Sequence, residues 1–163
     1  MAILKIIHAP KKYWDAAALR DVISYCTSPL KTNGLVGAYA VSTDPEQAIT
    51  QMQLLQTCLG QDRGIHLRHM VLSFDPQEKL SPGQAFQIGQ EVSKYYGYQY
   101  QVIFGVHCDQ PHLHIHFVMN TVNYRTGRKY RGDAKDFNSF LQHIQAVLSP
   151  YGIHINYIPQ TQE

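Results

Sequence analysis

Residues 100–120, YQVIFGVHCDQPHLHIHFVMN, contain two predicted strands, and their pairing predicts the centre of the sheet. The runs 100–107 and 113–120 are rich in β-branched and aromatic residues, and only a few polar residues and a proline separate them. Two strands this close in the sequence pair as an antiparallel hairpin. Because the proline fits poorly into a two-residue turn, we expect a four-residue loop from Asp109 to His112, which leaves His112 off the strands.

The apolar residues of the hairpin define its register. One register places all of the large apolar residues on one face, whereas a slip of one residue would scatter them. In this register His107 lies opposite His114, and Gly105 lies opposite His116 and leaves open space in front of it. Its apolar pairs are Val106 with Ile115, Phe104 with Phe117 and Val102 with Met119.

Three histidines of the hairpin share one face in that register, and they predict a metal site. His107, His114 and His116 can converge, since alternate side chains of a strand point the same way and opposed Cβ atoms lie about 5 Å apart. Three neutral imidazoles suit a divalent transition metal and leave positions open for substrate oxygens. We expect His112 to be a nearby donor or substrate contact and Asp109 to orient an imidazole. The alternatives are surface histidines without a metal, or a closed structural zinc site completed by Asp109.

The rest of the chain predicts helices packed on an antiparallel sheet. Apolar residues recur at helical spacing after residues that cap helices, and short apolar runs between them are typical of strands. This α+β pattern predicts an antiparallel sheet with helices on one face, in a single domain over residues 1–163. The expected strands are 3–8, 34–41, 69–74 and an edge strand at 153–155, and the expected helices run from Asp15 to Cys26, Asp44 to Gly60, Ser81 to Gly97 and Asp133 to Leu148.

Composition narrows the class of protein. No apolar run approaches the roughly 20 residues of a membrane helix, and no signal peptide opens the chain, so we expect a cytoplasmic protein without membrane insertion. The three cysteines lack the spacing of a disulfide framework or a zinc knuckle. A net charge of +2 is too small to indicate a nucleic-acid partner by itself.

The distribution of charge is more informative than its total. Five of the 14 basic residues fall within residues 125–135, interleaved with Tyr124 and Tyr130. Such a segment can neutralise phosphates while its rings stack on bases. The alternative is a solvated loop with ordinary surface charges.

Tyr25 is the candidate nucleophile. Leu19, Val22, Ile23 and Cys26 define the buried stripe of the first long helix, and Tyr25 lies more than 90° from its centre, at a flank that can face a cleft. The alternative is an amphipathic tyrosine at a core boundary.

Two motifs give this chain a resemblance to a known family. Residues 25–32, YCTSPLKT, resemble the tyrosine motif of the relaxase/mobilization nucleases of plasmids and conjugative transposons, which are HUH endonucleases. Residues 107–120 resemble the histidine motif of that family, and residues 68–76, RHMVLSFDP, are similar to its central strand. The chain departs from the tyrosine motif at Cys26, where the family has an aliphatic residue, and at Ser28, where it has asparagine.

The resemblance implies an HUH endonuclease sandwich of two or three layers that nicks one strand at an origin of transfer. Tyr25 would form a 5′-phosphotyrosine with help from Asp109 or His112 and from Mn²⁺ or Mg²⁺, with Zn²⁺ as a further option. It also implies single-stranded or hairpin origin DNA as a partner. Accessory relaxosome proteins and a coupling protein would bind through regions outside this chain. We expect this chain to be the N-terminal part of a longer protein. The expected DNA contacts are Lys31, Thr32, Arg68, Asn120, Arg125, Arg128, Lys129 and Arg131.

Three other functions fit the same residues. One is an HUH replication initiator or transposase, which shares the chemistry. Another is a metal-dependent hydrolase of a small phosphate ester, in which Tyr25 would be incidental. The last is a DNA-binding module with a structural metal, which would unfold when a chelator removes the ion.

Overall fold

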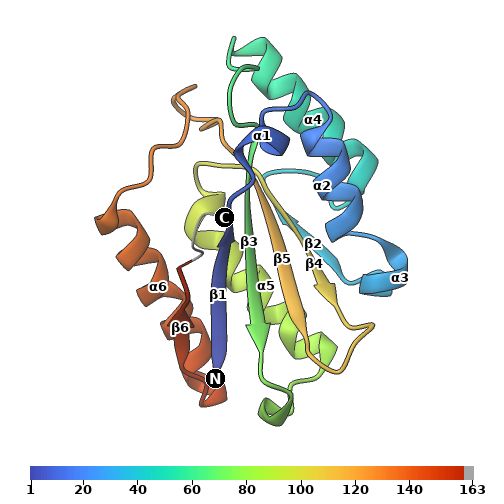
Figure 1. Cartoon of the computed structure of the whole chain (residues 1–163), viewed down its shortest axis with the longest axis vertical. Coiled ribbons are helices and arrows are strands. Elements are labelled where there is room, and N and C mark those ends of the chain that lie inside the picture. The colour runs from blue at the N-terminus through green and yellow to red at the C-terminus, as the bar shows by residue number, and fades with distance from the viewer. Residues whose placement is uncertain (160–163) are drawn as a thin grey trace.

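The central hairpin lies in the middle of a six-stranded sheet with the strand order β2-β4-β5-β3-β1-β6 (Figure 1). The structure is a computed structural model that describes residues 1–159. All neighbouring strands are antiparallel except β1 and β6, which are parallel. The strands are β1 (Ala2–Ile7), β2 (Val36–Tyr39), β3 (Leu67–Phe74), β4 (Val102–His107), β5 (His114–Asn120) and β6 (Ile155–Tyr157). The edge strand β6 begins where the expected strand over 153–155 ends.

The register expected for the hairpin is confirmed. His107 pairs with His114 and Gly105 pairs with His116, and the three apolar pairs also lie opposite one another. The expected four-residue loop is wrong, because residues 108–113 all lie outside the strands. His112 lies in that loop, off the strands, as expected.

Capping residues set the starts of the longer helices. Asp44 accepts a hydrogen bond from the Gln47 amide, Ser81 forms a complete capping box with Gln84, and Asp133 caps the last helix. Asp15 does not cap the first long helix, which begins three residues later, but it accepts a hydrogen bond from the Ala17 amide just before it. The helices are α1 (Pro10–Tyr13), α2 (Ala18–Cys26), α3 (Pro29–Thr32), α4 (Pro45–Cys58), α5 (Pro82–Gly97) and α6 (Ala134–Leu148). None of these described helices is both long and apolar enough to cross a membrane.

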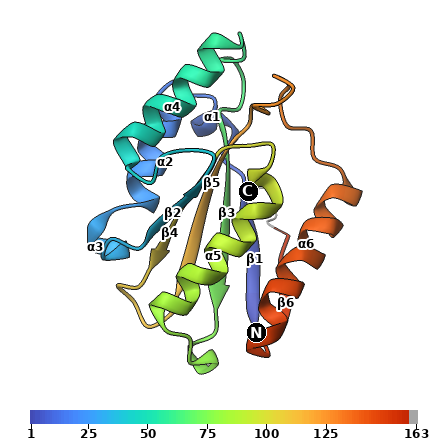
Figure 2. The same ribbon diagram turned by 180° about the vertical axis from the view of Figure 1, so that it is seen from behind.

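Helices cover both faces of the sheet, so the expectation of helices on one face was wrong. Helices α5 and α6 lie on the face seen in Figure 2, and α2 and α4 lie on the face seen in Figure 1. The reason is that β4 and β5 are apolar on both faces. Phe104 and Phe117 pack in the core with α5 and α6, whereas Ile103 and Val118 pack in a second core with α2 and α4.

A close helix-to-sheet contact at Gly89 gives a test of the core. A Cβ atom added at Gly89 of α5 would lie 2.5 Å from the ring of the fully buried Phe104, which cannot move away within the core. We expect Gly89→Ala to lower the free energy of unfolding by about 1–3 kcal/mol. Urea denaturation followed by circular dichroism measures this.

Gly83, in the first turn of the same helix, provides the control. A Cβ atom there would meet only the Ser81 hydroxyl, at 3.9 Å. Gly83→Ala should therefore leave stability unchanged or raise it by up to about 1 kcal/mol. Equal effects of the two substitutions would contradict the packing described for α5.

Candidate active site

The histidines expected to bind metal lie together at the loop end of the hairpin, where β4 ends and β5 begins. His107 ends β4, and His114 and His116 begin β5. The rings of His107 and His116 stack with centroids 4.0 Å apart, and those of His114 and His116 are 6.3 Å apart. His107 and His116 are buried, whereas His114 is partly exposed. The hairpin therefore collects three imidazoles in one place, with His114 on the side that solvent reaches.

Burial keeps these imidazoles neutral. It lowers the pKa of His107 and His114, and it lowers the pKa of His116 to about 2, with a further lowering by the neighbouring His107. A neutral imidazole retains one nitrogen lone pair, and that is the form that binds metals.

The end of α2 docks directly onto this cluster. The Nε2 atom of His107 lies 2.9 Å from the backbone carbonyl oxygen of Cys26. Because a carbonyl only accepts hydrogen bonds, Nε2 carries the proton and the Nδ1 lone pair of His107 stays available. This bond fastens the last turn of α2 to β4.

Gly105 allows that docking. A Cβ atom at Gly105 would lie 2.1 Å from the Cys26 carbonyl oxygen and 2.9 Å from Thr32. The expectation that Gly105 leaves open space in front of His116 was therefore wrong, because the backbone at the end of α2 fills that space.

Docking of α2 brings Tyr25 against the histidines. Its ring centroid lies 5.6 Å from that of His107 and 5.7 Å from that of His116, in edge-on contacts. The side chain is 50% exposed, while the neighbouring Cys26 is completely buried. Tyr25 therefore lies at the flank of α2, as the helical pattern predicted, and is accessible to a substrate that reaches the histidines.

Lys31 and Asp109 lie on the outer side of Tyr25. The ammonium nitrogen of Lys31, in α3, is 5.3 Å from the Tyr25 ring centroid and 3.8 Å from a carboxylate oxygen of Asp109. His112 is exposed, with its ring centroid 6.4 Å from that of His114. Asp109 thus contacts Lys31, and the hairpin loop holds it and His112 at the rim of the cluster.

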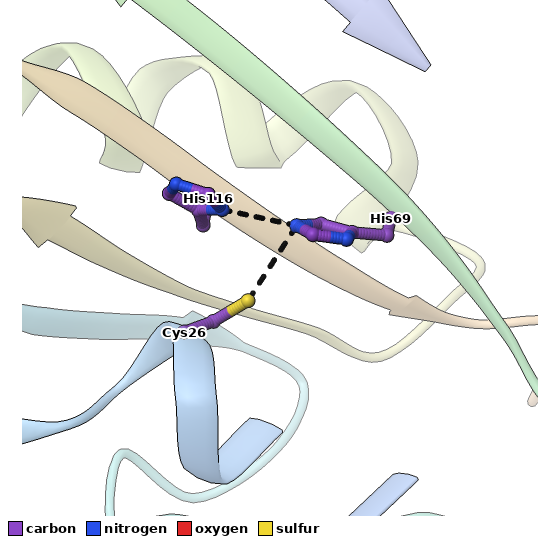
Figure 3. Close-up of side chains that lie close together, drawn as sticks. All are labelled: Cys26, His69 and His116. Atoms are coloured by element: carbon purple, nitrogen blue, oxygen red, sulfur yellow. Dashed lines mark hydrogen bonds between the residues drawn. The ribbon is translucent and has the colours of Figure 1, made fainter. Parts of the chain in front are cut away.

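A second group of side chains behind His116 was not anticipated from the sequence (Figure 3). The Nε2 atom of His69, in β3, lies 3.0 Å from Nδ1 of His116 and 3.6 Å from Sγ of Cys26. On its other side, Nδ1 of His69 lies 3.0 Å from the hydroxyl of Tyr13. The signal in the sequence was one histidine in a largely apolar run, residues 67–74, LRHMVLSF.

Cys26, His69 and His116 form a group that could hold a metal ion. Their donor atoms all lie within 4.8 Å of one another, and all three residues are buried. Burial raises the pKa of Cys26 to about 12 and lowers that of His69 to about 4, so the thiol is protonated and the imidazole neutral near pH 7.

Several residues expected to contact DNA form hydrogen bonds within the protein. Thr32 and Asn120 are completely buried, with side chains bonded to neighbouring groups, so neither reaches the surface. Arg68 donates to the hydroxyls of Tyr96 and Tyr130, and Lys129 donates to the Ile65 carbonyl and the Thr121 hydroxyl. Among the residues expected to contact DNA, those with exposed side chains are Arg125, Arg128 and Arg131.

Comparisons with known proteins match the chain to relaxases. Protein rlx of Staphylococcus aureus is 26% identical over 115 residues, which are 71% of this chain and 36% of that protein. The group II intron-interrupted relaxase LtrB of Lactococcus lactis subsp. cremoris is 33% identical over 101 residues, 53% of this chain and 18% of that protein. The chain thus spans between about a fifth and about a third of the length of these curated relatives.

A solved structure shares the fold. It comes from work titled "Molecular Basis of Vancomycin Resistance Transfer in Staphylococcus aureus", and it superposes with a TM-score of 0.63 over 99% of this chain and 100% of its own, at 8% identity. A family model described as the MobA/VirD2-like relaxase nuclease domain matches residues 25–153, a range that begins at Tyr25 and includes the whole histidine hairpin. This chain therefore belongs to the MobA/VirD2-like relaxase family, as a nuclease domain.

Proposed function

We propose that this nuclease domain nicks one strand of origin-of-transfer DNA through a covalent Tyr25 intermediate, in conjugative transfer or mobilisation. The observation that carries the proposal is the half-exposed phenol of Tyr25 packed edge-on against His107 and His116. A hydrolase of small phosphate esters would not require a tyrosine there. Family membership and the match to proteins named as relaxases support the assignment to transfer.

We assign a divalent metal to His107, His114 and His116, because neutral imidazoles are ligands that such an ion takes. All three imidazoles are held neutral by burial, and the hydrogen bond to Cys26 leaves the Nδ1 lone pair of His107 free. A divalent cation bound there would draw electron density from the non-bridging oxygens of the scissile phosphate and offset the charge that develops on them. Imidazole donors suit Zn²⁺ best, whereas Mn²⁺ and Mg²⁺ prefer oxygen ligands and would rely more on phosphate and water oxygens in the open positions.

In this proposal, His69, with Tyr13 and Cys26 around it, positions the ring of His116 and does not itself bind the metal. A thiol must lose its proton to bind a metal, and burial opposes that at Cys26. If His116 Nδ1–H donates to His69, and His69 Nδ1–H donates to Tyr13, the Nε2 lone pair of His116 is left for the metal. The reverse polarity would place a proton on that nitrogen, so the first arrangement is the one that we propose.

The chemical step exchanges one phosphate ester for another. The phenol oxygen of Tyr25 attacks phosphorus, the bond from phosphorus to the 3′ oxygen breaks, and that oxygen takes up a proton. The phenol proton leaves to a base, for which Asp109 and His112 at the rim are the candidates. Because both esters are of similar energy, the free 3′ hydroxyl can later attack the phosphotyrosine and reseal the strand.

Cations on the outer side of the site would hold the DNA backbone. Lys31 lies beside the Tyr25 ring, where its ammonium can neutralise a phosphate next to the attacking oxygen. Arg125, Arg128 and Arg131 are exposed and keep the role expected from the sequence. Origin DNA, single-stranded or hairpin, is the proposed substrate, with accessory relaxosome proteins and a coupling protein as further partners. Thr32 and Asn120 have no part in this set because they are buried.

Removal of the Tyr25 hydroxyl tests the covalent mechanism. We expect Tyr25→Phe to lower the rate of strand cleavage by about 10³-fold or more, since the attacking oxygen is lost. The measurement is incubation with single-stranded origin DNA and Mn²⁺, followed by a denaturing gel and mapping of the DNA adduct by mass spectrometry.

Tyr98→Phe is the matched control, because Tyr98 is a similarly exposed tyrosine at 54% and lies at the end of α5. This variant should cleave like the unmodified protein. A denaturant-resistant adduct formed by Tyr25→Phe would rule out Tyr25 as the nucleophile.

Cobalt binding separates the two possible metal sites. A thiolate ligand gives Co²⁺ an intense near-ultraviolet charge-transfer band, so a site on His107, His114 and His116 should lack this band. We expect Cys26→Ala to bind Co²⁺ about as tightly as the unmodified protein in calorimetric titrations, and His114→Ala to bind it at least about 10-fold more weakly. A charge-transfer band that disappears in Cys26→Ala would instead assign the metal to Cys26, His69 and His116.

Substitution of His69 tests the positioning role. We expect His69→Ala to weaken Co²⁺ binding by about 10–100-fold, since His116 loses the acceptor that fixes its tautomer. His69→Gln should recover part of this affinity, because its amide oxygen can accept the His116 proton. Equal affinities of His69→Ala and the unmodified protein would contradict the role.

A further inference from the structure

Cys26, His69 and His116 lie behind the histidine cluster with their donor atoms within 4.8 Å of one another (Figure 3). Nε2 of His69 is 3.0 Å from Nδ1 of His116 and 3.6 Å from Sγ of Cys26. Around a tetrahedral Zn²⁺ ion, bonds of about 2.0–2.1 Å to nitrogen and about 2.3 Å to sulfur place two nitrogen ligands about 3.4 Å apart and a nitrogen and a sulfur about 3.6 Å apart. Both separations at His69 are therefore close to those of a zinc site.

Tyr13 fixes the nitrogen that His69 presents to this group. The Tyr13 hydroxyl lies 3.0 Å from Nδ1 of His69. When Nδ1–H donates to that oxygen, the lone pair of Nε2 remains for a cation. Hydrogen bonds of this kind, from the nitrogen that faces away from the ion, orient the histidine ligands of metal sites. His69 thus has both the position and the tautomer that a ligand needs.

The thiol of Cys26 selects the cations that this group can bind. A cation must displace the thiol proton, and burial, which raises the pKa of Cys26 to about 12, opposes the loss of that proton. Thiophilic cations such as Zn²⁺ and Cd²⁺ overcome this cost because they bind thiolate strongly, whereas Mn²⁺ and Mg²⁺ prefer oxygen ligands. Co²⁺ binds a given site less tightly than Zn²⁺, so at one equivalent it should remain at the three histidines.

The sulfur atom is a feature of this chain. The tyrosine motif that residues 25–32 resemble carries an aliphatic residue where this chain has Cys26, and an aliphatic side chain offers no metal ligand. The proposed cleavage reaction does not use the sulfur either. Cys26 therefore gives this chain a donor that the reaction itself does not require.

We propose that Cys26, His69 and His116 form an inhibitory site for thiophilic divalent cations, Cd²⁺ or Zn²⁺ in excess, whose occupancy takes His116 from the catalytic ion. The inference rests on the proposed function, in which the catalytic ion uses Nε2 of His116. A neutral imidazole has one lone pair, so a cation on Nδ1 of His116 requires the ring proton on Nε2. The thiol proton leaves to solvent, and the catalytic ion loses one of its three ligands.

Ultraviolet absorption detects Cd²⁺ at the thiol, because a thiolate ligand gives a charge-transfer band that imidazoles do not give. A variant with Cys58→Ala and Cys108→Ala retains Cys26 as its only cysteine. We expect Cd²⁺ to produce the band in this variant, and the further substitution His69→Ala to weaken that binding at least about 10-fold. His114→Ala, which removes a ligand of the catalytic ion alone, should keep the band with at least the same affinity.

Mn²⁺ and Cd²⁺ should oppose each other at the shared ring of His116. Because coupling between two sites is reciprocal, each ion weakens the binding of the other by the same factor. We expect saturating Mn²⁺ to raise the Cd²⁺ concentration that gives half of the absorption band by about 5-fold or more. The effect should disappear when His114→Ala is added, since Mn²⁺ is then no longer held beside His116.

Inhibition of strand cleavage connects this site to the reaction. Cleavage of single-stranded origin DNA is measured in Mn²⁺ with increasing Cd²⁺, and each variant is compared with its own rate in Mn²⁺ alone. We expect Cys26→Ala to raise the Cd²⁺ concentration for half-inhibition by at least about 10-fold. The variant that lacks Cys58 and Cys108 should be inhibited like the unmodified protein. Circular dichroism verifies that each variant is folded.

Three outcomes would overturn the proposal. Cys26→Ala could be as sensitive to Cd²⁺ as the unmodified protein, which would assign the inhibition to direct competition for the three histidines. The absorption band could disappear in His114→Ala, which would indicate a single mixed site. Mn²⁺ could leave Cd²⁺ binding unchanged, which would show that the two sites are independent. A thiolate band in a protein that forms no Tyr25 adduct with origin DNA would instead support the cation site and contradict the proposed nuclease mechanism.

Discussion

The hydrogen bond between His107 and the Cys26 carbonyl holds the parts of this site together. It joins the end of α2 to the end of β4, two segments that lie far apart in the sequence. The bond is possible because Gly105 has no side chain, so the helix backbone can approach the strand. Without that close approach, α2 would not hold Tyr25 beside the histidines, because no interaction within α2 itself sets the position of this side chain relative to the sheet.

The site lies at the border between core and solvent. On the same face of the sheet, α2 and α4 cover the apolar residues of β4 and β5, whereas the histidines occupy the strand ends where that cover stops. His69 and His116 are buried enough to remain neutral, and each has a hydrogen-bond partner; among residues 1–159, no buried side-chain nitrogen or oxygen lacks one. A buried imidazole with a fixed partner keeps one orientation, which is what a metal ligand requires.

Polar residues of the histidine motif and the basic segment also stabilise the fold. Asn120 of β5 bonds to Gln56 of α4 and to Gln101, so it connects a helix to β5 and to the residue just before β4. Arg68 bonds to two tyrosines that in turn donate to Asp136 of α6. The bonds of Tyr130 to Arg68 and Asp136 hold the segment after β5 against β3 and α6.

The sequence by itself determined the hairpin, its register and the identity of the three clustered histidines, because these depend on local alternation and on pairing between adjacent strands. It also determined the helix starts at Asp44, Ser81 and Asp133, since caps act within one turn. Only the tertiary structure decided that helices cover both faces, that the end of α2 fills the space at Gly105, and that His69 and Tyr13 lie behind His116. Those features depend on contacts between segments distant in the chain, where several packings satisfy the same local pattern and only the complete fold selects one.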